Sequence, residues 1–83
     1  MNEKERATKD INKLKKILVE FKRYGLEKKY PQILEWAENY LHDSEFFFEK
    51  KDYFSAFGSA NYAFGIVDAI LIIENKKDET NVV

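Results

Sequence analysis

The chain has 83 residues, of which 45% are hydrophobic and 35% are charged, and its net charge at pH 7 is −1. This composition excludes a disordered chain, and the near-zero net charge gives no overall field that would attract nucleic acid or a membrane. The absence of cysteine excludes disulfide bonds and thiolate metal sites. We therefore expect one small folded domain over residues 1–75, followed by a flexible tail over residues 76–83.

The N-terminal sequence MNEKERATKD is charged, and no apolar run follows it, so it does not resemble a secretory signal. The longest apolar stretch is interrupted by Asp68, and we expect it to be too short to span a bilayer. These features predict a cytoplasmic protein without membrane contact.

Charge is distributed unevenly along the chain. Residues 1–29 carry ten Lys or Arg and five Asp or Glu, whereas residues 30–83 carry four and ten. Segments of opposite sign attract each other across a fold or a dimer, although the gain at exposed sites is small and falls with salt.

The first predicted helix covers residues 3–24. Asn2 and Glu5 have the spacing of a capping box, in which each side chain accepts a hydrogen bond from the backbone of the other residue. Gly25 can adopt the left-handed conformation that ends a helix, and Leu26 then packs back against Phe21. The apolar side of this helix repeats at alternating spacings of four and three residues: Ala7, Ile11, Leu14, Leu18 and Phe21.

The second predicted helix covers residues 31–50 and begins at Pro31, which a first turn tolerates. Trp36 lies at the edge of its apolar stripe. A very short connection, Lys51-Asp52, follows, and Asp52 is a strong candidate to cap the next helix. The short connection predicts that the second and third helices form a tight antiparallel hairpin. The stripe consists of Leu34, Ala37, Leu41, Ser44 and Phe48.

The third predicted helix, over residues 53–74, is the most apolar part of the chain. It contains no Lys or Arg, and Asp68 is its only carboxylate before Glu74. Two partner helices shield about two thirds of such a helix, so we expect another chain or a ligand to cover the rest. Gly58 and Gly65 support this expectation, because glycine inside a helix costs about 1 kcal/mol and close packing is the usual compensation. The predicted core seam consists of Tyr53, Ala56, Ala60, Ala63, Val67 and Ile70.

Polar and very small residues form a line along this third helix. One interpretation is a groove for a ligand or a partner helix, and the other is a polar network that fixes the register of a bundle. We favour the second interpretation. Asp43, on the second helix, is a secondary candidate. The candidate interaction or ligand residues on the third helix are Gly58, Asn61, Tyr62, Gly65 and Asp68.

Few features of the sequence suggest chemistry. His42 is the only histidine, and without cysteine or a second histidine no transition-metal site is expected. No phosphate-binding loop or nucleophile–base arrangement is present, so we expect no cofactor and no catalytic residue. A basic row on the first helix is better explained as a solvated face than as a nucleic-acid site. That row consists of Lys9, Lys13 and Lys16.

The hairpin sequence resembles a known family. Its runs Tyr40 to Ser44, Lys51 to Tyr53 and Asn61 to Ala69 are similar to the pattern Y-L-x-D-A, G-D-Y and N-Y-A-x-G-x-x-D-A. This pattern is that of an archaeal family of small helical proteins catalogued as domain of unknown function 357. The resemblance covers about residues 36–70. It implies a compact helical fold and an archaeal source but no activity, and Lys51 stands where the family generally has glycine.

A weaker resemblance exists to helical nucleotide-binding and ribonuclease modules. Their arginine-then-histidine motif is absent, so ribonuclease activity is not expected. Our main hypothesis is an all-α three-helix bundle, not an enzyme, that forms a homodimer or docks another protein through the third helix. The alternative is a small-ligand or nucleotide-binding module that uses Asn61, Tyr62 and Asp68. An enzyme acting through Asp43 and Asp68 has the least support.

Overall fold

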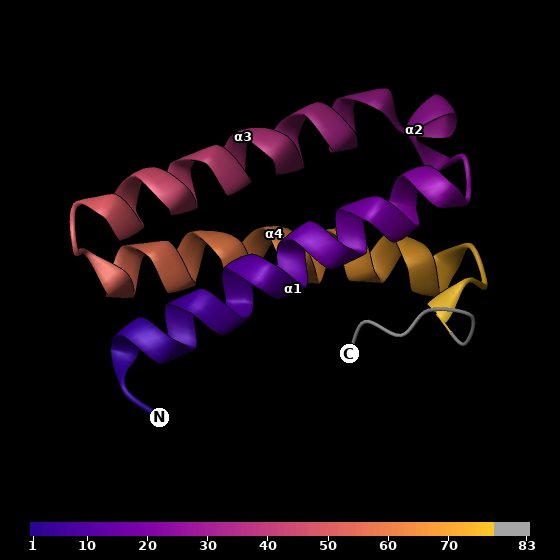
Figure 1. The fold of residues 1–83 in the computed structure, drawn as a ribbon. Coiled ribbons are helices and arrows are strands. Elements are labelled where there is room, and N and C mark those ends of the chain that lie inside the picture. The colour runs from indigo at the N-terminus through magenta and orange to yellow at the C-terminus, as the bar shows by residue number, and fades with distance from the viewer. Residues whose placement is uncertain (78–83) are drawn as a thin grey trace.

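The computed structural model describes residues 1–77 and is built from helices alone over that range. The elements are α1 (Glu3–Arg23), α2 (Leu26–Lys29), α3 (Pro31–Glu49) and α4 (Tyr53–Ile73). Helix α4 packs against both α1 and α3, which contact each other less (Figure 1). The prediction of an all-α bundle of three main helices is confirmed, and each main helix ends one residue earlier than predicted.

The ends of α1 are formed as the sequence predicts. Asn2 Oδ1 accepts a hydrogen bond from the Glu5 backbone at 2.8 Å, and Glu5 Oε1 accepts one from the Asn2 backbone at 3.4 Å. Gly25 has a φ of 72°, in the left-handed region, and Leu26 is buried in the core. Helix α2 is not predicted from the sequence, because a single helical turn of four residues is too short to show an apolar period.

The turn between α3 and α4 is equally regular. Asp52 Oδ1 accepts a hydrogen bond from the Ser55 backbone at 3.1 Å, which confirms the predicted cap. Lys51 has a φ of 64°, so a lysine occupies the left-handed position for which glycine is suited. The backbone N–H of Asp52 reaches the carbonyl of Phe47 at 2.9 Å, as in a Schellman motif. The hairpin therefore keeps its geometry at the expense of local backbone strain.

The core combines large side chains from α1 with small ones from α4. Phe21, Leu14 and Ile17 are fully buried, and they pack in a cluster that includes the buried alanines of α4. The predicted seam of α4 is right at its alanines and Val67 but wrong at its end. Leu71 is fully buried there, whereas Ile70 is only half-buried. The buried α4 residues are Ala56, Ala60, Ala63, Val67 and Leu71.

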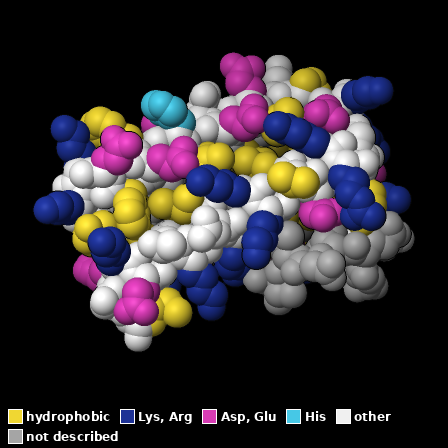
Figure 2. Space-filling view, in the orientation of Figure 1, with side chains coloured by type: hydrophobic (Ala, Val, Ile, Leu, Met, Phe, Trp, Pro, Cys, Tyr) yellow, Lys and Arg dark blue, Asp and Glu magenta, His cyan; other side chains and the backbone are white. Residues whose placement is uncertain are grey.

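Opposite charges meet across α1 and α3. Lys15 Nζ lies 3.1 Å from Glu45 Oε2, and Lys22 Nζ lies 3.2 Å from Glu38 Oε2. In Figure 2, acidic side chains follow α3 and basic ones follow α1 on the same face of the molecule. Because all four side chains are about half exposed, each pair contributes at most about 1 kcal/mol. The uneven charge of the sequence is thus partly compensated inside the fold.

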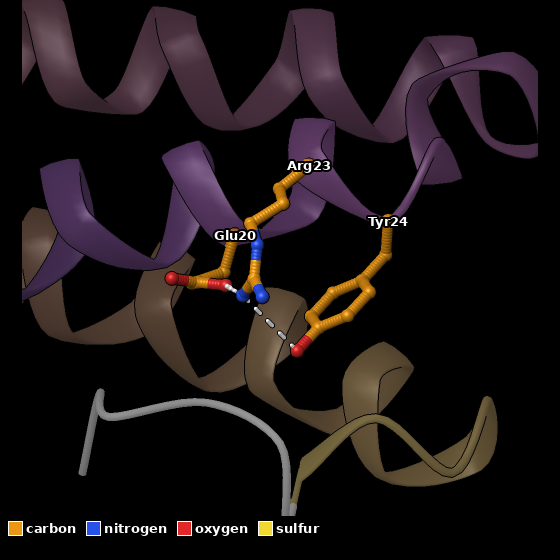
Figure 3. A network of polar contacts seen from close by, with 3 residues as sticks. All are labelled: Glu20, Arg23 and Tyr24. Atoms are coloured by element: carbon orange, nitrogen blue, oxygen red, sulfur yellow. Dashed lines mark hydrogen bonds and ion pairs between the residues drawn. The ribbon is translucent and has the colours of Figure 1, made fainter.

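Arg23 forms two polar contacts at the C-terminal end of α1. Arg23 Nη1 donates to Glu20 Oε2 at 2.7 Å and to Tyr24 Oη at 3.3 Å (Figure 3). The bond to Glu20 is the main reason that the pKa of Arg23 is raised. Beyond α4, the backbone N–H of Lys76 donates a hydrogen bond to the carbonyl of Leu71 at 2.8 Å. Residues 78–83 of the predicted tail lie outside the described residues.

Candidate interaction face

One side of α4 faces away from the core along its whole length. We call it the open face. It lies opposite the buried alanines, and none of its residues is charged. Four of the five predicted interaction residues on α4 belong to it. The open face consists of Phe54, Gly58, Asn61, Tyr62, Gly65, Ala69, Ile72 and Ile73.

The open face exposes large apolar side chains. Phe54 and Ile73 are each 75% exposed, Tyr62 is 55% exposed and Ile72 is 54% exposed. Single exposed apolar residues are normal on a protein surface, but a contiguous apolar patch is typical of an interaction site. The four side chains lie along one helix face, so they form a stripe rather than scattered contacts.

Between these large residues, the open face is flat. Among residues 1–77, a Cβ atom built on Gly58 or Gly65 would have no heavy atom within 4 Å apart from the adjacent backbone of α4 itself. The close packing expected at these glycines is therefore not supplied by residues 1–77 of the same chain, and its supply by another chain or a ligand stays a prediction. Each glycine costs about 1 kcal/mol relative to alanine in a helix, and within the described part of the chain no contact compensates for that cost.

An aromatic cluster borders the open face on the α3 side. The ring centroids of Trp36 and Tyr40 are 5.6 Å and 5.4 Å from that of Tyr62, and both contacts are edge-on. Such ring pairs are worth about 0.5–1.5 kcal/mol beyond the area that they bury. The cluster holds Tyr62 against α3. Sequence reasoning did not find it, although the spacing of Trp36 and Tyr40 places both on one side of α3.

On the α1 side, charged groups lie over aromatic rings. The Arg6 guanidinium lies 5.3 Å from the centroid of Phe57, and Lys13 Nζ lies 4.5 Å from that of Phe64. Asp68 is half-buried at this edge and forms an ion pair with Lys77. The structure therefore separates Asp68 from the exposed line formed by Gly58, Asn61 and Gly65.

The other candidates lie apart from the open face. Asp43 is exposed on α3, one turn beyond Tyr40, and His42 is exposed beside it. Sequence reasoning missed Asp10, a carboxylate on α1 that is only 8% exposed. Within residues 1–77, no three His, Asp or Glu side chains are grouped closely enough to hold a metal ion.

Two surface hollows lie near the end of the bundle that holds the α3–α4 turn. Neither includes any of the six predicted interaction residues. The first is lined by Met1, Asn2, Glu3, Arg6, Tyr53, Phe54 and Phe57. The second is lined by Thr8, Ile11, Asn12, Lys15, Glu45, Phe48 and Glu49. The candidate residues are therefore not brought together in either of these two hollows.

Helix α4 also corrects an expectation about membranes. Its 21 residues are long and apolar enough to cross a bilayer by length and composition alone, so the predicted shortfall in length is wrong. The core helix of a soluble protein passes the same test, and five residues of α4 are buried against α1 and α3. The property is weak evidence for a membrane span.

Comparison with known proteins identifies a family without an assigned activity. The family described as "Protein of unknown function (DUF357)" matches residues 5–75, which include all of α1, α2, α3 and α4 except the first two residues of α1. No curated protein and no solved structure matches the chain.

Proposed function

The chain belongs to the DUF357 family, and since that family has no known activity we propose a function from the surface: a non-enzymatic helical module that self-associates through the open face of α4. The observation that carries the proposal is the uncharged, apolar open face opposite the core. Another protein is the alternative occupant of the same face.

The hydrophobic effect favours covering this face. Removing apolar surface from water contributes roughly 25 cal/mol per Å². Phe54 and Ile73, each 75% exposed, lie near the two ends of α4, so a partner that contacts both must cover the whole helix. A chain of this size buries a smaller fraction of its surface on folding than a larger domain does, so association adds to its stability.

The two glycines support the same proposal. Their open surroundings leave room for the backbone of another helix to approach α4 closely. A partner that uses this room compensates for the helix propensity lost at Gly58 and Gly65. In this proposal Gly58 and Gly65 are interface residues, which explains why residues of low helix propensity stand inside α4.

The test is sedimentation equilibrium over a micromolar concentration range, with Ala69→Glu as the interface variant. Ala69 lies in the middle of the open face, so a glutamate there adds a charge that an apolar contact must desolvate. We expect the native chain to self-associate and the variant to be monomeric with unchanged helicity. Val19→Glu is the matched control, because Val19 is an exposed apolar residue on α1, 64% exposed, and we expect it to behave as the native chain does.

Two results would contradict this proposal. A native chain that stays monomeric excludes self-association, and the search then turns to other protein partners for the same face. A native assembly that Ala69→Glu leaves intact places the interface elsewhere on the molecule.

A small-ligand or nucleotide-binding module remains the alternative function. It would use Asn61, Tyr62 and Asp68, of which Asn61 and Tyr62 are exposed and Asp68 is paired with Lys77. A thermal-shift screen against nucleotides and coenzymes tests it, and stabilisation that is lost in Asn61→Ala would support it. The cytoplasmic location stays a prediction from the sequence.

A further inference from the structure

We propose that the occupant of the open face is a second copy of this chain, related by a two-fold axis that runs along α4, so that the two α4 helices are parallel. This inference rests on the proposed self-association through the open face and adds the symmetry and orientation of the pair. Area, the pattern of residues along α4 and the charges beside it each support it.

The exposed area is sufficient for a dimer. At about 150–250 Å² for a large side chain, the four large residues of the open face, which are 54–75% exposed, present roughly 500 Å². The four smaller exposed residues bring the open face to roughly 700 Å² in each copy. A stable interface buries about 800 Å² on each partner, and a biological interface should exceed about 1,000 Å² in total. Two open faces together exceed that lower limit without any change of fold.

The pattern along α4 suits a parallel pair. Gly58, Gly65 and Ile72 are seven residues apart, so they repeat on one line of the helix. In a parallel pair related by a two-fold axis along α4, each residue on this line lies opposite its own copy. Small residues then meet small residues in the middle, where the helices approach closely, and Ile72 meets Ile72 towards one end.

The helices beside α4 carry charges of opposite sign. Helix α1 contains eight Lys or Arg and four Asp or Glu, whereas α3 contains five Asp or Glu and no Lys or Arg. Contacts of Phe57 with Arg6 and of Tyr62 with Tyr40 place α1 and α3 on opposite sides of the open face. A two-fold axis along α4 therefore brings α1 of one copy beside α3 of the other.

The positions of Arg6 and Asp43 along the axis of the bundle agree with this arrangement. Arg6 lies level with Phe57, and Tyr40 lies level with Tyr62. Asp43 follows Tyr40 by one turn of α3. Because α3 runs antiparallel to α4, Asp43 lies near the level of Phe57 as well. In the parallel dimer, Asp43 of one copy thus stands at the height of Arg6 of the other.

An antiparallel pair lacks these features. A two-fold axis across α4 places α1 beside α1, so the basic sides of the two copies face each other. Like charges at an interface disfavour association. The same axis places Gly58 opposite the region of Ile72, whereas the parallel pair places Gly58 opposite its own copy. An experiment can distinguish these two sets of neighbours.

Cross-linking of single-cysteine variants tests the proposal, because the chain has no cysteine of its own. The variants are Gly65→Cys at the centre of the line and Gly58→Cys and Ile72→Cys towards its ends, each treated with a short bismaleimide. Val19→Cys, on the outer side of α1, is the control for random collision. We expect each of the three α4 variants to form covalent dimers by itself, and Val19→Cys to remain monomeric.

The other outcomes separate this inference from the proposed function. If Gly65→Cys cross-links but Gly58→Cys and Ile72→Cys do so only when mixed with each other, the pair is antiparallel, which overturns the inference and leaves the interaction face. If none of the three cross-links while the native chain remains an Ala69→Glu-sensitive assembly, the parallel dimer is equally overturned. If the native chain is monomeric, self-association through the open face fails as well.

Discussion

Tyr30 Oη donates a hydrogen bond to Glu74 Oε2 at 2.5 Å, which joins the residue before α3 to the residue after α4. Lys29 Nζ donates to the same oxygen at 2.8 Å. The bond from Lys29 and then that from Tyr30 hold the pKa of Glu74 below its ordinary value. The bond to Glu74 raises the pKa of both Tyr30 and Lys29.

These shifts predict how Glu74→Gln changes stability with pH. A carboxyl group whose pKa is lowered by folding stabilises the protein above its ordinary pKa, and this contribution is lost as the pH falls through the folded pKa. We expect Glu74→Gln to have a lower Tm than the native chain at pH 7 and a smaller deficit in Tm at about pH 3. Thermal unfolding followed by circular dichroism at both pH values measures the difference.

Glu35→Gln is the control for this experiment, since Glu35 is an exposed carboxylate on α3. We expect its Tm to stay close to that of the native chain at both pH values. A Glu74→Gln variant that is as stable as the native chain at pH 7 would show that the contact with Lys29 and Tyr30 contributes nothing.

The glycines of the open face predict opposite effects on stability and association. Because a Cβ at Gly58 or Gly65 meets no packed neighbour among the residues that the structure describes, each change to alanine should stabilise the separate chain by about 1 kcal/mol. The same Cβ would occupy the space between two α4 helices, so the dimer should weaken. Denaturant unfolding at low concentration and sedimentation equilibrium measure the two quantities. Stabilisation without weaker association would remove both glycines from the interface.

The left-handed conformation of Lys51 predicts that a substitution by glycine makes the chain more stable. This residue's φ of 64° suits glycine, so Lys51→Gly should stabilise the chain by about 1 kcal/mol by removing steric strain. Lys50, with a φ of −80°, is the matched control, and Lys50→Gly should be neutral or destabilising. Denaturant unfolding of both variants checks the prediction, which fails if the two substitutions have the same sign and size.

The parallel dimer predicts that reversing the charge of Asp43 weakens association and that reversing the charge of Arg6 as well restores it. Asp43→Lys should weaken association several-fold, because it places a cation opposite the basic side of α1. Arg6→Glu in the same chain should restore much of the loss, whereas Glu35→Lys should have less effect on the dimer. Dissociation constants at low and high salt measure the coupling. Additive effects of Asp43→Lys and Arg6→Glu would mean that the two residues do not meet.

The local features of the fold could be predicted because they depend on neighbours in the sequence. The Asn2–Glu5 box, the left-handed Gly25 and the Asp52 cap each involve residues at most three positions apart. The same kind of pattern showed that α4 has more apolar surface than two helices cover. Family resemblance over the hairpin agreed with the match to residues 5–75.

The contacts of the candidate site could not be predicted in the same way. Trp36 and Tyr62 are 26 positions apart, and only the packing of α3 on α4 brings their rings together. The pairing of Asp68 with Lys77 was one of several alternatives, since the sequence offered Tyr62, Asn61 or a lysine as its partner. The open space at Gly58 and Gly65 depends on where α1 and α3 pack, which no local pattern encodes.

The sequence by itself therefore determined the helices, their ends and the excess of apolar surface on α4, because hydrogen bonding and periodicity are local. Only the tertiary structure decided which side of α4 stays open and which of its residues have partners within the chain. That choice depends on the packing of α1 and α3 against the alanines of α4, which leaves the opposite side exposed.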